Sequence, residues 1–219
     1  MDVREERTEP VVYIVDDDAG VRDSLSFLVE SVGHQVNLCA SSEEFLEKLD
    51  GERNACVILD LRLPGMDGLE LLVQLGRRGV RIPVILLTAY ADVGIAVRAM
   101  KAGAFDLFEK PCNDHSLLEC IHRALERDRQ VKRQQAIRDD IKERFDRLTP
   151  RELEVLKHIV AGRATRRIAE VLNVSKKTIE AHRSNLMHKL DAESVVGLVR
   201  MYCMLYGDGP HGTDRPRLN

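Results

Sequence analysis

Acidic side chains, a threonine and a lysine follow short apolar segments in the first half of the sequence. The four places are Asp16-Asp17-Asp18 after residues 11–15, Asp60 after 56–59, Thr88 after 83–87, and Lys110 after 105–108. Clustered carboxylates raise one another's pKa unless a cation lies among them, and all-oxygen ligands favour a hard ion such as Mg²⁺. A lysine adds a second positive charge. Such a cluster could neutralise an incoming phosphoryl group and let one carboxylate attack it.

These side chains can cooperate only if the apolar segments are strands that end at one edge of a sheet. The predicted strands cover residues 11–15, 36–38, 56–59, 83–87 and 105–108, and segments of helical periodicity follow them at 21–32, 42–49, 69–75, 93–100 and from Leu117. Apolar strands that alternate with helices indicate a parallel sheet covered on both faces. We therefore predict an α/β fold, a doubly wound five-stranded parallel sheet. Function is expected at the carboxyl ends of its strands.

Single residues in this pattern have simpler interpretations. Asp and Thr are common at strand ends because they favour turns. Asp18 alone is best interpreted as a charge at the start of the following helix. Ser42 is expected to cap the helix that contains Phe45 and Leu46.

Four segments resemble the receiver domains of the response-regulator superfamily, and the resemblance spans residues 10–125. They are Val15-Asp16-Asp17-Asp18, Asp60-Leu61-Arg62-Leu63-Pro64-Gly65-Met66-Asp67-Gly68, Thr88-Ala89 and Lys110-Pro111. The resemblance implies the flavodoxin-like or CheY-like version of the predicted fold. It also implies that a partner sensor histidine kinase phosphorylates Asp60. The protein would accept the phosphoryl group on its own aspartate and would not be an enzyme that turns over substrate.

The resemblance implies a metal site for Mg²⁺ or Mn²⁺. Asp17, Asp60 and the backbone carbonyl of Arg62 would bind the ion, and Asp16 would assist through water. An aspartyl-phosphate phosphatase is the rival interpretation, but such enzymes need a second acid two residues after the nucleophile. Arg62 occupies that position here.

The resemblance also implies phosphoryl contacts and a switch. Thr88 and Lys110 would contact the phosphoryl group, and Ala89 is small enough to admit it. Thr88 and Leu107 hold the switch positions, but an aromatic residue is usual where Leu107 stands. Strand alternation places the adjacent Phe108 on the opposite face of the sheet, so Phe108 is not an obvious substitute.

Two smaller features follow the lysine. We expect the Lys110–Pro111 peptide bond to be cis. Cys112 stands where a phenylalanine is common, and only local repacking is expected from it.

The two ends of the chain have opposite charge. Residues 1–125 carry 13 Lys or Arg and 22 Asp or Glu, whereas residues 149–206 carry 10 and 6. The basic part suggests a polyanionic partner. With aromatic residues at 4% and no tryptophan, a stacking surface for single-stranded nucleic acid is unexpected.

Residues 126–147 are predicted to form a helical linker. Its apolar residues recur at helical spacing: Ile137, Ile141, Phe145 and then Leu148. Either a solvated helix or the seam of a coiled-coil dimer would fit this narrow stripe. Thr149-Pro150-Arg151-Glu152 is a strong helix start with a capping box, so a domain boundary is placed just before it.

Residues 165–190 have the pattern of two helices joined by a short turn. Asn173 suits a left-handed turn, and Ser175 can cap the second helix. The expected helices of this part cover about 150–161, 165–172, 176–190 and 192–206. Residues on the exposed face of the second helix of the pair could enter the major groove of DNA.

Residues 145–206 resemble the LuxR/NarL-type helix-turn-helix, and the whole chain is similar to FixJ-type regulators. The matching segments are residues 148–156, Ile168-Ala169 and residues 175–183. The residues that the pattern and the resemblance place at DNA are Lys176, Lys177, Thr178, Glu180, Ala181, Arg183, Ser184 and Lys189. The implied partners are double-stranded promoter DNA, a second copy of the chain after phosphorylation, and RNA polymerase.

The predicted organisation has five parts. They are a flexible N-terminus at 1–10, a receiver domain at 11–125, the linker at 126–147, an all-α helix-turn-helix domain at 148–206 and a disordered tail at 207–219. No apolar run reaches the roughly 18 residues of a membrane span, so we expect a cytoplasmic protein without membrane contact. The five cysteines form no CxxC pair, so we expect reduced thiols. A DNA binder that ignores phosphorylation remains the alternative to a two-state switch.

Overall fold

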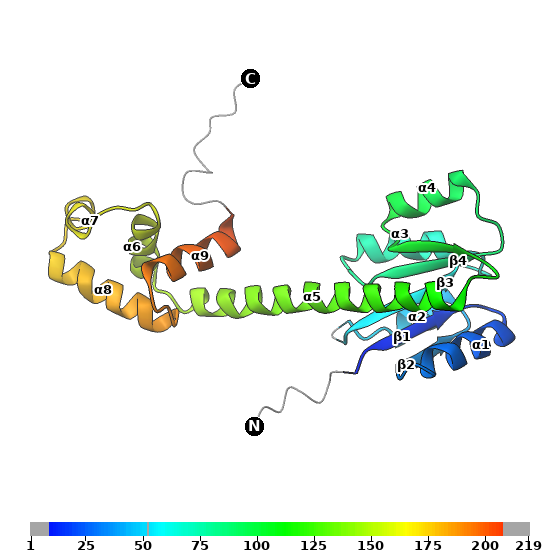
Figure 1. Ribbon diagram of the computed structural model, residues 1–219. Coiled ribbons are helices and arrows are strands. Elements are labelled where there is room, and N and C mark those ends of the chain that lie inside the picture. Colours follow the sequence, from blue (N-terminus) through cyan, green and yellow to red (C-terminus); the bar gives the residue numbers. More distant parts are fainter. Residues whose placement is uncertain (1–8, 52, 208–219) are drawn as a thin grey trace, which may run out of the picture. The chain divides into compact units, whose positions relative to one another are not determined.

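The structure is a computed structural model that describes residues 9–51 and 53–207. The two segments expected to be flexible or disordered, 1–10 and 207–219, lie mostly outside the described residues. In the part of the chain that is described, five parallel strands form one sheet in the order β2-β1-β3-β4-β5 (Figure 1). The strands are β1 (Val11–Val15), β2 (Gln35–Cys39), β3 (Ala55–Asp60), β4 (Val84–Thr88) and β5 (Asp106–Glu109). The predicted α/β fold class is confirmed.

Helices follow the strands and cover both faces of the sheet. They are α1 (Ala19–Glu30), α2 (Ser42–Lys48), α3 (Gly68–Arg77), α4 (Val93–Ala102) and α5 (Asp114–Asp146). Alternate residues of β1 enter two separate cores. Tyr13 and Val15 pack with α2, α3 and α4, whereas Val12 and Ile14 pack with α1 and α5. The apolar strands are thus buried from both sides, as their composition predicts.

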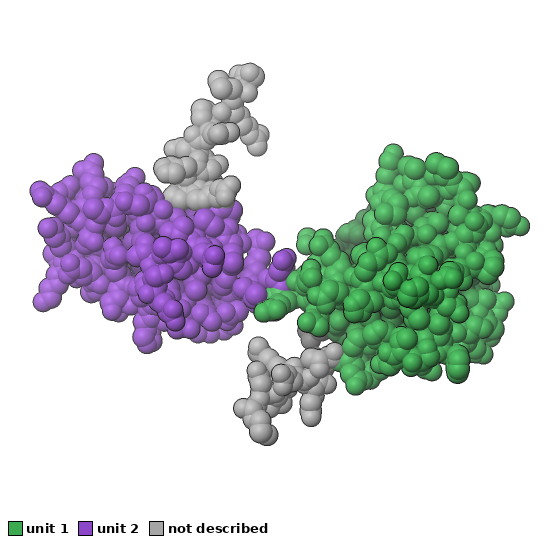
Figure 2. All heavy atoms as spheres, viewed as in Figure 1, with its two compact units in different colours: residues 1–133 green, residues 134–219 purple. Residues whose placement is uncertain are grey.

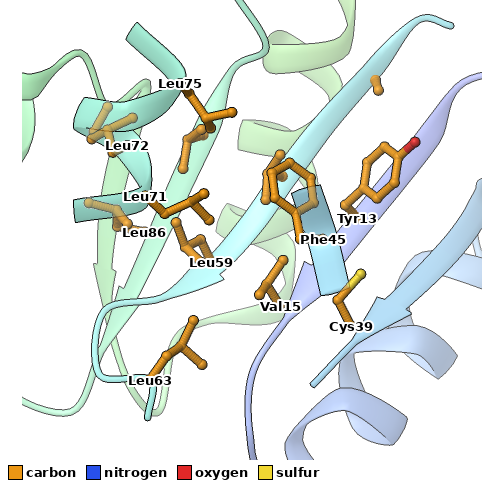
Figure 3. Packing of buried hydrophobic residues seen from close by; sticks show 14 of the residues in the cluster. Tyr13, Val15, Cys39, Phe45, Leu59, Leu63, Leu71, Leu72, Leu75 and Leu86 are labelled. Atoms are coloured by element: carbon orange, nitrogen blue, oxygen red, sulfur yellow. The ribbon is translucent and has the colours of Figure 1, made fainter. Parts of the chain in front are cut away.

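The core under α3 shows how one helix is held on the sheet. Leu71, Leu72 and Leu75 of this helix are at most 4% exposed. They point toward Leu59 and Leu86 of the two central strands (Figure 3). This packing fixes the segment between β3 and α3, which follows Asp60 directly.

Helix boundaries differ from the sequence predictions at several places. Ser41 caps α2 by accepting the Glu44 N–H, whereas the predicted cap, Ser42, is buried and donates to the Met66 carbonyl. Helix α1 begins at Ala19 and ends before Val32, which is 49% exposed. Helix α5 begins at Asp114, three residues before the predicted start. Polar residues near helix ends offer several possible caps, and only the packing selects one of them.

The C-terminal half is all helical. Its helices are α6 (Pro150–Val160), α7 (Thr165–Leu172), α8 (Lys176–Lys189) and α9 (Val195–Tyr206). The predicted capping box is present, because Thr149 accepts the Glu152 N–H and Glu152 accepts the Thr149 N–H. Asn173 has the left-handed conformation (φ 54°) that the turn after α7 requires, and Ser175 caps α8. These local signals define the helix-turn-helix.

The chain divides into two compact units between residues 133 and 134, within α5 (Figure 2). The division falls earlier than the boundary predicted before Thr149. Ile141 and Phe145 of α5 are 6% and 5% exposed and belong to the core of the C-terminal unit, whereas Ile137 is 46% exposed. Most of the apolar stripe is therefore neither solvated nor free to form a dimer seam.

Replacing Phe145 tests whether the last turns of α5 belong to this core. Phe145→Ala should lower the free energy of unfolding of the C-terminal unit by about 3–5 kcal/mol, because it leaves a cavity. Ile137→Ala, on the same helix but exposed, should change it by less than about 1 kcal/mol. Urea unfolding followed by circular dichroism would measure both. Equal effects of the two substitutions would contradict the packing described.

Candidate functional site

Lys110 joins two buried carboxylates at the carboxyl ends of the strands. Its Nζ lies 2.6 Å from Oδ2 of Asp16 and 2.7 Å from Oδ1 of Asp60. The two aspartates are 2% and 7% exposed. Lys110 is itself held by its backbone N–H, which donates to the Thr88 carbonyl at 2.8 Å. Strands β1, β3 and β4 and the residue after β5 thus bring four predicted site residues together.

This group has one more negative charge than positive charge. Burial raises the pKa of Asp60 above its ordinary value, and the hydrogen bond from Lys110 offsets only part of that effect. Asp16 acts in the same direction as burial, because it is a second carboxylate beside the same ammonium. Burial alone would lower the pKa of Lys110, but its bonds to the two carboxylates raise it. The lysine therefore stays charged and cannot neutralise both partners.

The donor set fits a hard divalent cation. In the described part of the chain, no three His, Cys, Asp or Glu side chains already form a metal site. However, Mg²⁺ in phosphate sites commonly uses one or two carboxylates together with water and phosphoryl oxygens. Asp16 and Asp60 offer carboxylate oxygens here, and exposed Asp17 adds another carboxylate next to Asp16 in the chain. The uncompensated charge is what such an ion would neutralise.

The segment after Asp60 wraps closely around it. The Arg62 N–H donates to Oδ2 of Asp60 at 2.9 Å, so the backbone of Arg62 faces this carboxylate. A Cβ atom at Gly68 would lie 2.4 Å from the Asp60 carbonyl oxygen. Only glycine fits at this point without moving the backbone that carries Asp60. The sequence offered a signal for this, since Gly68 starts a helix eight residues after the acidic position.

Thr88 is placed at the site but has its own partner. Its hydroxyl donates to the Tyr90 carbonyl at 3.1 Å and accepts the Tyr90 N–H at 3.2 Å. The Tyr90 ring is 69% exposed and lies 5.9 Å from the Arg62 guanidinium carbon. Ala89 between them is exposed. Tyr90 has no apolar spacing or motif around it that could have pointed to this position.

Leu107, one of the two predicted switch positions, and the adjacent Phe108 lie on opposite faces of the sheet, as predicted. Leu107 packs against the core under α2, α3 and α4, whereas Phe108 packs against the core under α1 and α5. Asp18 is the N-cap of α1 and accepts the N–H groups of Gly20 and Val21. The Lys110–Pro111 peptide bond is cis. Cys112 is partly buried against the α1–α5 core.

The second helix of the helix-turn-helix presents most of the predicted DNA contacts to solvent. Lys176, Lys177, Thr178, Glu180, Ala181 and Ser184 are exposed, whereas Ile179 and Leu186 are buried. Arg183 is half-buried and donates to the Thr165 hydroxyl at 3.3 Å, which ties α8 to α7. The exposed face can meet phosphates and base edges.

Lys189 has a partner inside the C-terminal unit. Its Nζ lies 2.7 Å from Oε2 of Glu152, whose side chain is 5% exposed, and it also donates to the Arg147 carbonyl at 3.3 Å. Burial raises the pKa of Glu152, but the hydrogen bonds from Lys189 and Thr149 outweigh burial and lower the pKa below its ordinary value. This contact attaches the end of α8 to the start of α6. It gives Lys189 a structural role that sequence reasoning missed.

Comparisons with known proteins agree with this geometry. Residues 12–122 match the family model described as "Response regulator receiver domain", and residues 146–202 match "Bacterial regulatory proteins, luxR family". The chain is 42% identical to the transcriptional regulatory protein FixJ of Rhizobium meliloti, covering 93% of this chain and 99% of that protein. It is 39% identical to FixJ of Bradyrhizobium diazoefficiens, covering 89% and 95%.

The chain belongs to the FixJ-type response regulators. Among solved structures it is similar to the response regulator StyR, with a TM-score of 0.83 and 36% identity over 89% of this chain and 98% of that one. It is also similar to full-length FixJ from B. japonicum, with a TM-score of 0.55 and 38% identity over 90% and 97%.

This response regulator therefore combines a receiver domain with a LuxR-type DNA-binding domain, and it regulates transcription within a two-component system. Its relatives are named as transcriptional regulators rather than as enzymes. Receiver domains generally bind Mg²⁺ at the phosphorylation site. Among the helices that the structure describes, none has the length and apolarity to cross a membrane.

Gly68→Ala tests the close approach to Asp60. The added Cβ must displace the Asp60 carbonyl, so we expect a loss of about 1–3 kcal/mol in stability and roughly 10- to 100-fold slower phosphoryl uptake. Gly76→Ala, in the same helix, meets no atom within 4 Å. It should leave uptake unchanged. Thermal unfolding and the rate of phosphorylation by a small phosphoryl donor would measure the effects, and equal behaviour of the two variants would contradict the argument.

Glu152→Gln tests the ion pair with Lys189. Because the pKa of Glu152 is lowered in the folded state, its charge stabilises the fold above the ordinary glutamate pKa of about 4.3, and this contribution is lost as the pH falls below it. The variant should lose roughly 1–3 kcal/mol at pH 7. Its deficit should shrink as the pH falls below that value and through the lowered pKa of Glu152 in the folded state. Glu154→Gln, whose exposed side chain pairs with Arg151, is the control. A deficit that stayed constant with pH in urea unfolding would rule out the charge as its cause.

Proposed function

We propose that this response regulator is switched by phosphorylation of Asp60 and then binds promoter DNA as a dimer. A sensor histidine kinase is the proposed donor, and residues 11–125, 126–147 and 148–206 act as receiver, linker and DNA-binding domain. The observation that supports it best is the ammonium group of Lys110 within 2.7 Å of both buried aspartates. A regulator of chromosomal promoters would act in the cytoplasm.

The chemistry follows from the charges at the site. A carboxylate oxygen of Asp60 attacks the phosphorus atom of a phosphohistidine, the N–P bond breaks, and the histidine nitrogen leaves with the electron pair. Lys110 can hold a phosphoryl oxygen by the same ammonium that now binds Asp60. Asp16, Asp17, Asp60 and the Arg62 carbonyl would hold Mg²⁺ or Mn²⁺, which neutralises negative charge on the phosphoryl group when bound.

The Thr88 hydroxyl is the proposed sensor of the phosphoryl group. Thr88 is 1% exposed, and in the described part of the chain its hydroxyl has hydrogen bonds only to the backbone of Tyr90, two residues later. To bind a phosphoryl oxygen, it must give up its bond to the Tyr90 carbonyl. The segment 88–90 would then shift, and Leu107 would move within the core next to it instead of an aromatic ring. The contact between the Tyr90 ring and the Arg62 guanidinium would change at the same time.

Dimerisation is proposed to use the face of α4 and β5. Val93, Val97 and Met100 of α4 are 82%, 46% and 51% exposed and recur at i, i+4 and i+7. Such an apolar stripe is expected to pair when the switch rearranges it. Two copies of α8 could then read two half-sites, and the exposed residues of that helix would contact phosphates and bases. Contact with RNA polymerase would follow on the promoter.

Asp60→Asn tests the proposal as a whole. The variant should take up no phosphoryl group, since an amide cannot form the acyl phosphate. On phosphorylation, the wild type should gain about 5- to 150-fold in DNA affinity, which is the usual range of such coupling. Its mass should double at the same time. Asp18→Asn is the control. Asparagine can also cap a helix, so this substitution removes only a negative charge at the start of α1.

Mass spectrometry, light scattering and gel shifts on a selected DNA site would measure these effects. Phosphoryl uptake by the Asp60→Asn variant would refute the site. Wild-type protein that bound DNA equally in both states would favour a constitutive DNA binder. Steady hydrolysis of phosphate monoesters would favour the phosphatase, although Arg62 stands where that enzyme needs an acid.

A further inference from the structure

Asp128 is a buried carboxylate that the proposed function does not use. It lies on α5 and is 2% exposed. Its Oδ2 accepts the Ala55 N–H at 2.9 Å and the Lys132 ammonium at 2.7 Å. Lys132 also donates to the Arg53 carbonyl. We name these four residues the β3–α5 clamp.

The clamp makes a contact that an apolar residue could not make. A buried carboxylate costs free energy unless it is paired and hydrogen-bonded, and apolar side chains of similar volume are often at least as stabilising. Asp128 here satisfies the backbone N–H of the first residue of β3. An unsatisfied buried N–H would destabilise the fold. The carboxylate therefore ties helix α5 to the backbone of one particular strand.

That strand carries Asp60 at its other end. All six residues of β3, Ala55 to Asp60, are buried, and the strand is paired with β1 on one side and β4 on the other. A strand paired on both sides moves with little internal deformation. A displacement of Asp60 along the strand direction is therefore transmitted to the Ala55 N–H, which is the clamp's hydrogen bond to β3.

Asp128 is also the last buried residue of α5 in the N-terminal unit. Residues 129–140 of the helix contain no buried side chain, and the next buried residue is Ile141, which belongs to the core of the C-terminal unit. The clamp is thus the final point at which the receiver holds α5. Beyond the clamp, residues 133–140 are all exposed, and Arg138 among them donates to the Leu205 carbonyl at 3.3 Å.

We propose that Asp128 is a positioning residue that couples Asp60, through β3 and Ala55, to the exposed part of α5. Lys132 holds the carboxylate in place and caps the contact by its bond to Arg53. The state of Asp60 then alters how firmly residues 129–140 are held as helix. This inference rests on the proposed function, because it requires that phosphorylation of Asp60 changes DNA binding.

The test uses the full chain and compares Asp128→Ala with Asp139→Ala. Asp139 is an exposed acid of the same helix that accepts a hydrogen bond from Gln135, so it controls for loss of charge and of helix contacts. Asp128→Ala should take up phosphate from a small donor with Mg²⁺ within twofold of the wild-type rate. Its ratio of DNA affinities with and without phosphorylation should fall at least fivefold. Asp139→Ala should match the wild type in both.

A second variant and a second measurement keep the proposal testable if Asp128→Ala folds poorly. Lys132→Met leaves the Asp128 bond to Ala55 in place but removes the ammonium, and it should reduce the affinity ratio by about half as much on a logarithmic scale. Hydrogen exchange of the amides of residues 129–140 should change on phosphorylation in the wild type and not in Asp128→Ala. A merely structural role would lower stability without removing this response.

The outcomes separate the two proposals. If wild-type protein shows no effect of phosphorylation on DNA binding, the proposed function fails and this inference fails with it. If the wild type responds and both clamp variants respond equally, the proposed function stands and the role of Asp128 is refuted. If Asp139→Ala loses the response as much as Asp128→Ala, the effect belongs to the helix in general and the clamp is again refuted.

Discussion

The ion pairs of Lys110 with Asp16 and Asp60 impose the main constraint on the receiver. The three side chains lie far apart in the sequence, and they meet only because parallel strands end at one edge of a sheet. Two buried carboxylates that share one ammonium retain a negative charge, and an uncompensated buried charge lowers the stability of the fold. A fold with no function for this charge would lose that stability without any gain. The parallel order, the buried strands and the close wrap of the chain after Asp60 all serve to maintain this arrangement.

The sequence predicted the elements whose signals are local. Unbroken apolar strands, the capping box at Thr149 and the left-handed Asn173 need only neighbouring residues to be interpreted. The convergence of strand ends followed from topology. What the sequence could not show were contacts between distant segments. Ser41 and Ser42 are equally good caps, and only the packing of Ser42 under the Met66 carbonyl decides between them.

Charged helix residues were the least predictable. Lys189 stands on the predicted DNA-binding helix and looks like its neighbours there, yet it binds a glutamate that is 37 positions away. Asp128 is one charge among many in a highly charged helix, and nothing local marks it as buried. Ile141 and Phe145 formed a stripe too narrow to indicate a partner. In each case the deciding neighbour comes from another element, so periodicity and propensity carry no information about it.

A single arrangement recurs at four buried carboxylates, and it varies in how many carboxylates share one lysine. Each accepts a hydrogen bond from a lysine and another from a backbone N–H: Asp16 from Lys110 and Asp18, Asp60 from Lys110 and Arg62, Asp128 from Lys132 and Ala55, and Glu152 from Lys189 and Thr149. At Asp128 and Glu152 one lysine faces one carboxylate, so the charges balance and the ion pair has a structural role. At Asp60 the same lysine also serves Asp16. The excess charge leaves that site in need of a cation, and a carboxylate in that condition can gain from a change in its covalent state. In this chain the proposed phosphoacceptor thus differs from the two carboxylates that have a lysine of their own by one additional aspartate.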